Sequence, residues 1–192
     1  DLNKVLKQKT LIINVAKGFH PETHALLMDV IRDTISEDKL QGVVSLIGPS
    51  HAEEVVIREL TTINAVSRVE EDAVTVQRLF SNEYFRVYTN TDETGAQIGV
   101  AIKNVIALAS GVLSGLGMGD NAKAALMTRG LAEMTRLGVA LGGQAETFLG
   151  LCGVGDLIVT CTSIHSRNFQ AGFKIGEQNS AKDFFETNTK TV

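Results

Sequence analysis

The first half of the sequence alternates short β-branched runs with helical patterns, and this alternation constrains the fold more than any other feature. Apolar, β-branched runs predict buried strands over 10–15, 43–47, 62–66 and 85–88. Helical patterns fall between these strands, and the last of them covers 70–80. Strands joined by helices are typical of βαβ units, so we predict a mostly parallel, doubly wound sheet.

Two of the connecting helices carry start signals. Pro21 suits the first turn of a helix whose apolar stripe ends at Ile35. Gly48-Pro49 ends the second strand, and Ser50 with Glu53 three residues later predicts a capping box for the next helix.

Composition changes near residue 91, which divides the chain into two predicted parts. Fifteen of the 18 glycines follow this point, whereas both prolines precede it. Helical patterns fill the second half, with long helices over 94–114 and 120–137 and shorter ones over 144–185. The sequence therefore predicts an α/β plus all-α architecture, with half of a sheet domain over 1–91 and a helical domain over 92–192.

Charge and cysteine content exclude several classes of protein. The 192 residues carry 18 Lys and Arg against 22 Asp and Glu, so we expect no nucleic-acid partner. Cys152 and Cys161 give neither a disulfide framework nor a zinc motif, which favours a cytoplasmic location. Lys103 is the only charged residue in 94–119, but glycines and polar residues interrupt this stretch, so we expect no stable membrane insertion.

Lys103 lies within the first long predicted helix, and its helical neighbours are uncharged and mostly small. These neighbours are Ala96, Gly99, Val100, Ile106, Ala107 and Ser110. Burial in such surroundings lowers the pKa of a lysine, which can then exchange a proton near neutral pH as a general acid or base. The alternative is a lysine at the helix edge, whose stem covers apolar surface while its amine reaches water.

Polar segments elsewhere could surround an anionic or hydroxyl-bearing ligand. Asp156 follows a Gly-Val-Gly turn and could orient a lysine, or could simply cap the next helix. Ser166-Arg167-Asn168 precede a short helix, whose free N–H groups with the guanidinium would cradle a phosphate or carboxylate; a capped polar turn is the alternative. Two further segments follow predicted strands, where the ligands of α/β sheets bind: Lys17-Gly18 and Gly48-Pro49-Ser50. The alternative is that these residues only form the loops after the strands.

Two other candidate sites are rejected. His20 and His24 have Pro21 between them and lack a third ligand, so we expect no metal. The Gly115-Leu-Gly-Met-Gly119 run follows a helix rather than a strand, which excludes a dinucleotide-binding fingerprint at this place.

Eight segments carry motifs that recur together, in this order, in one family. The segments are Val15-Ala-Lys-Gly18, Gly48-Pro-Ser-His-Ala52, Phe85-Arg-Val-Tyr88, Gly99-Val-Ala-Ile-Lys-Asn-Val-Ile-Ala107, Asp120-Asn-Ala-Lys-Ala-Ala-Leu126, Thr128-Arg-Gly-Leu-Ala-Glu-Met134, Gly150-Leu-Cys-Gly-Val-Gly-Asp-Leu157 and Ser163 to Asn168. Over nearly its whole length, the chain resembles the bacterial-type NAD(P)-dependent glycerol-3-phosphate dehydrogenases.

The resemblance implies a fold and an activity. Residues 1–91 would be part of a Rossmann-like dinucleotide-binding domain, and 92–192 would be a helical substrate domain. The implied reaction is reversible hydride transfer between NADPH or NADH and dihydroxyacetone phosphate, which gives sn-glycerol 3-phosphate for glycerophospholipid synthesis. The expected partners are a small phosphorylated substrate, NADP or NAD as cofactor, and a second copy of the chain in a homodimer.

The resemblance also implies roles by motif position. Lys103 would exchange a proton with the substrate oxygen, and Asp156 would orient it. The substrate contacts would be Lys17, Gly48, Ser50, Asn104, Thr160, Ser166, Arg167 and Asn168, with the phosphate held by the last three. The cofactor contacts would be Lys17, Ala52 and Arg167.

The sequence departs from the family's pattern in three places. The Gly-rich phosphate loop is absent, and we expect it upstream of Asp1. Phe169-Gln-Ala171 stands where further basic residues are usual. A cofactor-contacting Glu is expected shortly after Val192. We therefore expect a chain truncated at the N-terminus and at the C-terminus, which by itself binds NADPH poorly and turns over little.

Two other functions stay open at this point. One is a related two-domain reductase of another small hydroxy acid, although Arg167 and Asn168 favour a phosphorylated substrate. The other is a non-catalytic helical dimerisation module, which the close-packing glycines would suit. Such a module gives no reason for a lone Lys103 on a small-residue face.

Overall fold

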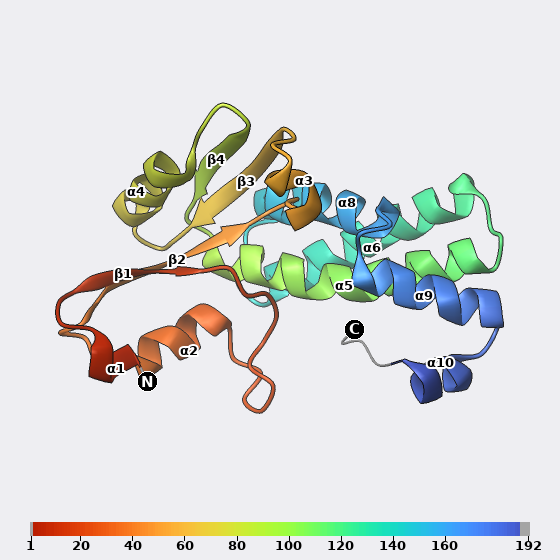
Figure 1. Cartoon of the computed structure of the whole chain (residues 1–192), viewed down its shortest axis with the longest axis horizontal. Coiled ribbons are helices and arrows are strands. Elements are labelled where there is room, and N and C mark those ends of the chain that lie inside the picture. Colours follow the sequence, from red (N-terminus) through yellow and green to blue (C-terminus); the bar gives the residue numbers. More distant parts are fainter. Residues whose placement is uncertain (1, 189–192) are drawn as a thin grey trace.

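The computed structural model describes residues 2–188 and contains a sheet with its helices and a helical bundle. Figure 1 shows the sheet at one end of the molecule, with the long helix α5 (Glu93–Gly115) running from it into the bundle. This arrangement confirms the predicted α/β plus all-α fold class. The last strand ends at Asn90, and the all-helical part follows directly.

The sheet contains four strands in the order β1-β2-β3-β4, close to the predicted positions. The strands are β1 (Thr10–Asn14), β2 (Leu40–Ile47), β3 (Thr61–Val66) and β4 (Phe85–Asn90). The helices of this part are α1 (Leu2–Val5), α2 (Leu27–Thr34), α3 (Ala52–Val56) and α4 (Glu70–Phe80). The strand pairs β1–β2 and β3–β4 are parallel, as predicted.

The middle strand pair differs from the predicted mostly parallel sheet, because β2 and β3 are antiparallel. The connection between them holds only the five-residue helix α3. A parallel crossover usually carries a longer helix that returns along the face of the sheet. The chain instead turns back beyond the end of β2, and Ile47 comes to lie opposite Asn64.

The predicted starts of α2 and α3 are both wrong. α3 begins at Ala52 without a side-chain cap, and the Ser50 hydroxyl donates to the Gly48 carbonyl oxygen at 3.2 Å instead of capping the helix. α2 begins at Leu27, so Pro21 lies in the turn before the helix rather than in its first turn. Both helices thus begin later in the chain than the sequence signals predicted.

The two faces of the sheet pack against different helices, because side chains alternate along each strand. Val44, Ile63 and Val87 belong to a buried cluster with residues of α4. Ile47 and Val66 belong to a second cluster with residues of α5 and the segment around Cys152. The second cluster joins the sheet to the helical part, so it fixes the strand ends relative to α5.

The helical part packs around α5. The elements that follow it are α6 (Asp120–Ala140), α7 (Ala145–Leu149), the short π-helical segment η1 (Leu151–Gly155), α8 (Asp156–Thr162), α9 (Arg167–Gln178) and α10 (Ala181–Thr187). Asp92 caps α5, since its carboxylate accepts hydrogen bonds from the backbone N–H of Gly95 at 2.9 Å and of Gln144 at 2.8 Å. The long helices predicted over 94–114 and 120–137 are confirmed, although α6 continues past Gly138 to Ala140.

Glycines let α9 lie directly against α5. A Cβ atom on Gly111 would collide with the carbonyl oxygen of Phe169, and one on Gly172 with that of Leu108. Within residues 2–188, α5 is the one helix long and apolar enough to cross a membrane. Here α6, α8 and α9 surround it, which accounts for its apolar composition.

Candidate active site

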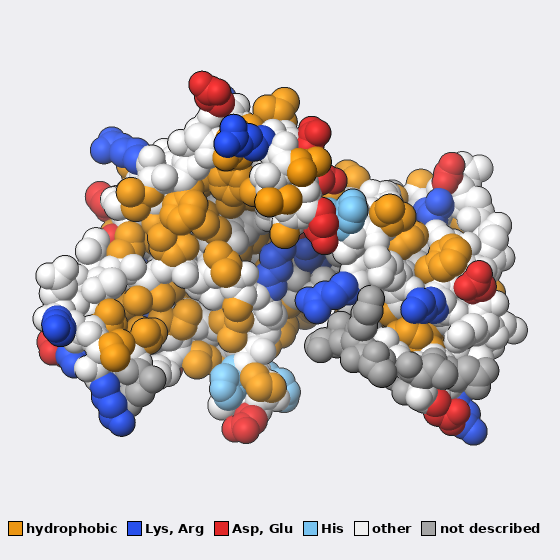
Figure 2. Space-filling view, viewed as in Figure 1, with side chains coloured by type: hydrophobic (Ala, Val, Ile, Leu, Met, Phe, Trp, Pro, Cys, Tyr) orange, Lys and Arg blue, Asp and Glu red, His pale blue; other side chains and the backbone are white. Residues whose placement is uncertain are grey.

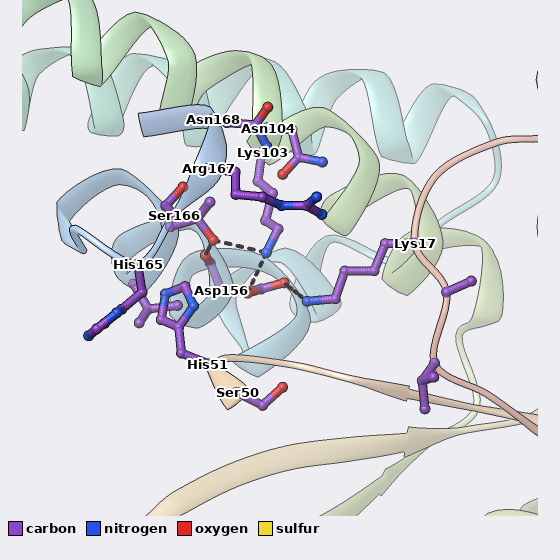
Figure 3. Close-up of a pocket in the computed structure, with 14 residues that line it drawn as sticks. Lys17, Ser50, His51, Lys103, Asn104, Asp156, His165, Ser166, Arg167 and Asn168 are labelled. Carbon is purple, nitrogen blue, oxygen red and sulfur yellow. Dashed lines mark hydrogen bonds and ion pairs between the residues drawn. The ribbon is translucent and has the colours of Figure 1, made fainter. Parts of the chain in front are cut away.

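A cavity of about 600 Å³ lies where the chain leaving β1 and β2 meets the helical part. Figure 2 shows this region as a hollow between two lobes with Lys and Arg side chains inside it, and Figure 3 shows the side chains around it. Most of the predicted site residues line the cavity. They are Lys17, Ser50, Lys103, Asn104, Asp156, Thr160, Ser166, Arg167 and Asn168.

Lys103 projects from α5 into the wall of the cavity. The residue is only 4% exposed, so the alternative of an amine that reaches open water is wrong. Its Nζ donates to the Thr160 hydroxyl oxygen at 2.9 Å and pairs with Asp156 Oδ1 at 2.5 Å. Two oxygens therefore hold the amine in a defined position.

Asp156 and Thr160 lie one turn apart on α8, which places both side chains beside Lys103. The Thr160 hydroxyl donates to the Asp156 backbone carbonyl oxygen at 2.5 Å, so its own oxygen remains an acceptor for the lysine. α8 begins at Asp156 without a side-chain cap, so the alternative role of this carboxylate as a helix cap is wrong. Gly99 permits the approach of this region to α5, since a Cβ atom there would lie 2.7 Å from the Cys152 carbonyl oxygen.

Two lysines share the Asp156 carboxylate. Oδ2 lies 3.6 Å from Lys17 Nζ, which is close enough for an ion pair and too far for a hydrogen bond. This buried oxygen has no hydrogen-bond partner among the described residues. The Lys17 side chain is 34% exposed, so it reaches inward from the mouth of the cavity. One carboxylate thus balances only part of the surrounding positive charge.

Burial lowers the pKa of Lys103 from its usual 10.5 to about 8. Loss of water around the amine is the largest cause; the negative charge of Asp156 opposes it, and the positive charge of Lys17 reinforces it. With such a pKa, about three quarters of the amine is protonated at about pH 7.5, so both protonation states are well populated. This is the behaviour required of a group that both gives and takes a proton.

The N-terminus of α9 forms another wall of the cavity. The predicted cap at Ser166 is confirmed, since its hydroxyl oxygen accepts from the Phe169 backbone N–H at 3.2 Å. Arg167 and Asn168 are the first residues of the helix, and Figure 3 shows the Arg167 side chain reaching across the cavity in the direction of Lys17. Free backbone N–H groups, a guanidinium and an amide in one place suit an anionic oxygen group.

Gly48 and Ala52 are not among the residues that line this cavity. Gly48 has a φ angle of 153°, and a Cβ atom there would lie 2.9 Å from the Ile63 Cα atom. Backbone packing therefore explains the glycine. Ala52 is the exposed first residue of α3. The contacts predicted for these two residues stay predictions.

Sequence reasoning missed two histidines that line the cavity. His51 comes from the β2–α3 loop and His165 from the turn before α9, and their ring centroids lie 5.9 Å apart. His51 stands between Ser50 and Ala52, two predicted contacts, and that position was the available signal. For His165 the signal was its place beside the cap at Ser166.

The cysteines and the acidic residues offer no other chemistry here. Cys152 and Cys161 are free, buried thiols, and burial raises the pKa of each to about 12. Within residues 2–188, no three His, Cys, Asp or Glu side chains are grouped to hold a metal ion. The described residues of the cavity therefore offer lysines, an arginine, two histidines, a carboxylate, hydroxyls and the N-terminus of α9.

Two family models match this chain. The model described as NAD-dependent glycerol-3-phosphate dehydrogenase N-terminus matches residues 1–73, and the model described as the C-terminus of the same enzyme matches residues 92–192. A curated relative from Enterococcus faecalis, named glycerol-3-phosphate dehydrogenase [NAD(P)+], is 55% identical over 181 residues, which cover 94% of this chain and 53% of the relative. A relative of the same name from Lactiplantibacillus plantarum is 54% identical over 180 residues, with the same coverage of both chains.

Solved structures agree with these sequence matches. The crystal structure of glycerol-3-phosphate dehydrogenase from Coxiella burnetii superposes with a TM-score of 0.89 at 34% identity, over 99% of this chain and 57% of that one. The yeast enzyme superposes with a TM-score of 0.80 at 27% identity, over 93% of this chain and 54% of that one. The chain spans about half the length of the curated relatives that it matches. It belongs to the NAD-dependent glycerol-3-phosphate dehydrogenase family.

Proposed function

We propose that this protein interconverts dihydroxyacetone phosphate and sn-glycerol 3-phosphate, with NADP or NAD as the hydride carrier, and so supplies glycerophospholipid synthesis. The observation that carries the proposal is the buried Lys103 amine, held by Asp156 and Thr160 at a cavity that also presents Arg167. Reduction of a ketone requires a proton for its oxygen, and recognition of a phosphate ester requires cationic and N–H donors. The names of the relatives support the same activity.

The charge of the cavity suits a phosphorylated substrate. Lys17, Lys103 and Arg167 supply three positive charges when protonated, and Asp156 supplies one negative charge, which leaves an excess of two. A phosphate monoester carries about −1.5 to −2 charges near neutral pH. A phosphate at the α9 N-terminus would therefore nearly neutralise the cavity, whereas a neutral hydroxy compound would leave the excess of two positive charges unbalanced.

Lys103 performs the proton transfer in this proposal. During reduction, the ketone carbon gains a hydride while an N–H bond of the ammonium breaks and its proton passes to the ketone oxygen. During oxidation, the neutral amine takes the proton from the alcohol. Asp156 and Thr160 hold the amine in place, and burial, reinforced by the charge of Lys17, keeps its pKa low enough for both directions.

Lys17 and Arg167 also suit a dinucleotide, because they are partly exposed cations at the mouth of the cavity and a dinucleotide carries phosphates. These residues would contact the part of the cofactor that lies in this cavity. When bound, the nicotinamide ring supplies or accepts the hydride.

The test is an activity assay of a hybrid enzyme that has the full length of a curated relative. We would replace the matching 181 residues of the Enterococcus faecalis relative by the segment of this chain and follow NADPH oxidation with dihydroxyacetone phosphate. Lys103→Met should lower kcat by about a hundredfold or more, because general acid–base groups contribute about 10²–10⁴. Lys103→Arg should fail as well, since a guanidinium does not release its proton. Lys123→Met, outside the cavity on α6, is the matched control and should keep full activity.

The same hybrid separates the alternatives. A reductase of another hydroxy acid would turn over an unphosphorylated keto acid faster than dihydroxyacetone phosphate in a substrate panel. A non-catalytic dimerisation module would leave kcat unchanged in Lys103→Met. Either result contradicts the proposal, and loss of kcat at Lys103 together with a preference for the phosphorylated ketone supports it.

We further propose that the protein works in the cytoplasm as a homodimer. The two cysteines are buried free thiols, which a reducing compartment preserves. Leu137, Val139 and Leu141 expose about half of their surface at the end of α6, and apolar side chains of this kind suit a contact between subunits. Sedimentation of the 20.6 kDa chain as a monomer at micromolar concentration would contradict the dimer.

A further inference from the structure

His51 holds a fixed place between the two parts of the molecule. Its backbone carbonyl oxygen accepts hydrogen bonds from the N–H groups of Glu54 and Val55, both at 3.1 Å, and this anchors the residue at the start of α3. Its ring lines the cavity and lies at an interplanar angle of 55° to the ring of His165. In Figure 3 the His51 ring lies between His165 and Asp156. The side chain therefore projects from the sheet part toward residues of the helical part.

The His51 ring also carries an unsatisfied polar atom. Its Nε2 is buried and has no hydrogen-bond partner among the described residues. A buried nitrogen without a partner destabilises a fold, and such atoms are rare unless a water, a ligand or an ion satisfies them. Because the ring lines the cavity, it can satisfy this nitrogen by turning toward an acceptor placed there.

The surroundings of His51 indicate what kind of acceptor would fit. The cavity already presents the cations Lys17, Lys103 and Arg167, and its one carboxylate is paired with both lysines. Among the described residues of the cavity, the buried acceptor without a hydrogen bond is Asp156 Oδ2, and it makes none with the His51 ring, so a ligand can supply the partner that the ring nitrogen lacks. An oxygen-rich anion satisfies a ring N–H and neutralises the excess positive charge at the same time.

We propose that His51 is a further substrate-binding residue, which donates a ring N–H to a phosphate oxygen of the three-carbon substrate. The inference rests on the proposed function and adds to it a contact from the sheet part. The phosphate then bridges Arg167 and Asn168 of α9 and the β2–α3 loop. A phosphate-bearing ligand thereby contacts both parts of the protein, whereas the same molecule without phosphate lacks this contact.

The test uses the imidazole signals of the 192-residue chain in ¹H–¹³C NMR spectra. The sequence has four histidines, and His51→Gln and His24→Asn spectra identify the His51 signal and a remote one. His24 lies in an exposed loop at a φ angle of 57°, which asparagine tolerates, so His24→Asn is the matched control. The chain is titrated with sn-glycerol 3-phosphate, with glycerol, and with NADPH.

We expect sn-glycerol 3-phosphate to shift the His51 ring signals, and glycerol to leave them unchanged. By calorimetry, His51→Ala should weaken binding of sn-glycerol 3-phosphate about tenfold, as loss of one hydrogen bond to a charged group does. His51→Gln, which keeps an N–H donor, should bind more tightly than His51→Ala. His24→Asn should bind like the wild type.

Three results would overturn the inference. In the first, sn-glycerol 3-phosphate binds and shifts the Arg167 side-chain signal while the His51 signals stay in place; the proposed function then survives. In the second, NADPH alone shifts the His51 signals, which assigns the ring to the cofactor. In the third, sn-glycerol 3-phosphate binds neither to the wild-type chain nor to the hybrid enzyme, which removes the proposed function together with the inference.

Discussion

Replacement of Asp156 by asparagine should lower the pKa of Lys103 well below 8. The amine lies 2.5 Å from Oδ1 of this carboxylate, and Asp156 is the main group that raises its pKa against burial. Asparagine keeps the shape and removes the charge, whereas the nearby charge of Lys17 stays. Since one adjacent opposite charge is worth about 1–3 pKa units, we expect a pKa of about 5–7 in Asp156→Asn.

The ε-methylene signal of Lys103 in ¹H–¹³C spectra, assigned by its loss in Lys103→Met, measures this pKa directly. The wild-type chain should titrate near pH 8, and Asp156→Asn should titrate lower. In the hybrid enzyme, the variant should lose the reduction of dihydroxyacetone phosphate at about pH 7.5, because little of its amine carries a proton there. An unchanged or higher pKa in Asp156→Asn would refute the reasoning, since it would mean that the carboxylate does not govern the amine.

The remaining predictions concern stability and its dependence on pH. Gly172→Ala should lower the free energy of unfolding in urea by about 1–3 kcal/mol, because its Cβ atom would collide with the Leu108 carbonyl oxygen; an unchanged midpoint would contradict the close contact of α5 and α9. Glu93→Gln should cost about 1–3 kcal/mol in the same assay, because the buried Glu93 carboxylate accepts two hydrogen bonds from Arg32 at 2.9 and 2.6 Å; wild-type stability would contradict this role. Lys103 binds its proton less tightly in the folded chain than in the unfolded chain, so its burial destabilises the fold less as the pH rises. We therefore compare the free energy of unfolding of the wild type with that of Lys103→Met. The difference, wild type minus variant, should rise by about 2 kcal/mol from about pH 7.5 to about pH 9.5. A flat or falling difference would contradict the lowered pKa.

Hydrophobic periodicity predicted the positions of the strands and helices well. It predicted the direction of the strands and the starts of the helices less well. The strand around Val44 and the long helix around Lys103 lie where apolar patterns placed them, because burial imposes those patterns. The antiparallel pair of β2 and β3 escaped prediction, since strand direction depends on the path of the connection and not on the strand residues. The false capping box at Ser50 had the right spacing, but α3 begins at Ala52 with His51 at the N-cap position, and the Ser50 hydroxyl donates to the Gly48 carbonyl oxygen.

The same division applies to the candidate site. Features set by one segment of the sequence were easier to predict than contacts between distant segments. The small helical neighbours of Lys103 left both a buried amine and an amine in water open, and the structure decides for burial, whereas the cap at Ser166 was predicted from local spacing. The contact of Lys103 with Asp156 joins residues far apart in the chain, so it was predicted only through the family resemblance and not from the pattern of either segment. His51 drew no attention because an isolated histidine in a loop has no periodic signal, and its importance depends on the cavity that forms around it.

The most direct test of the account is a crystal structure of the 192-residue chain with sn-glycerol 3-phosphate. The account predicts the phosphate at the N-terminus of α9, in contact with Arg167 and Asn168, and the C2 hydroxyl oxygen about 3 Å from Lys103 Nζ. A ligand whose phosphate lies outside this cavity, or whose C2 oxygen is separated from Lys103 by solvent, would contradict it.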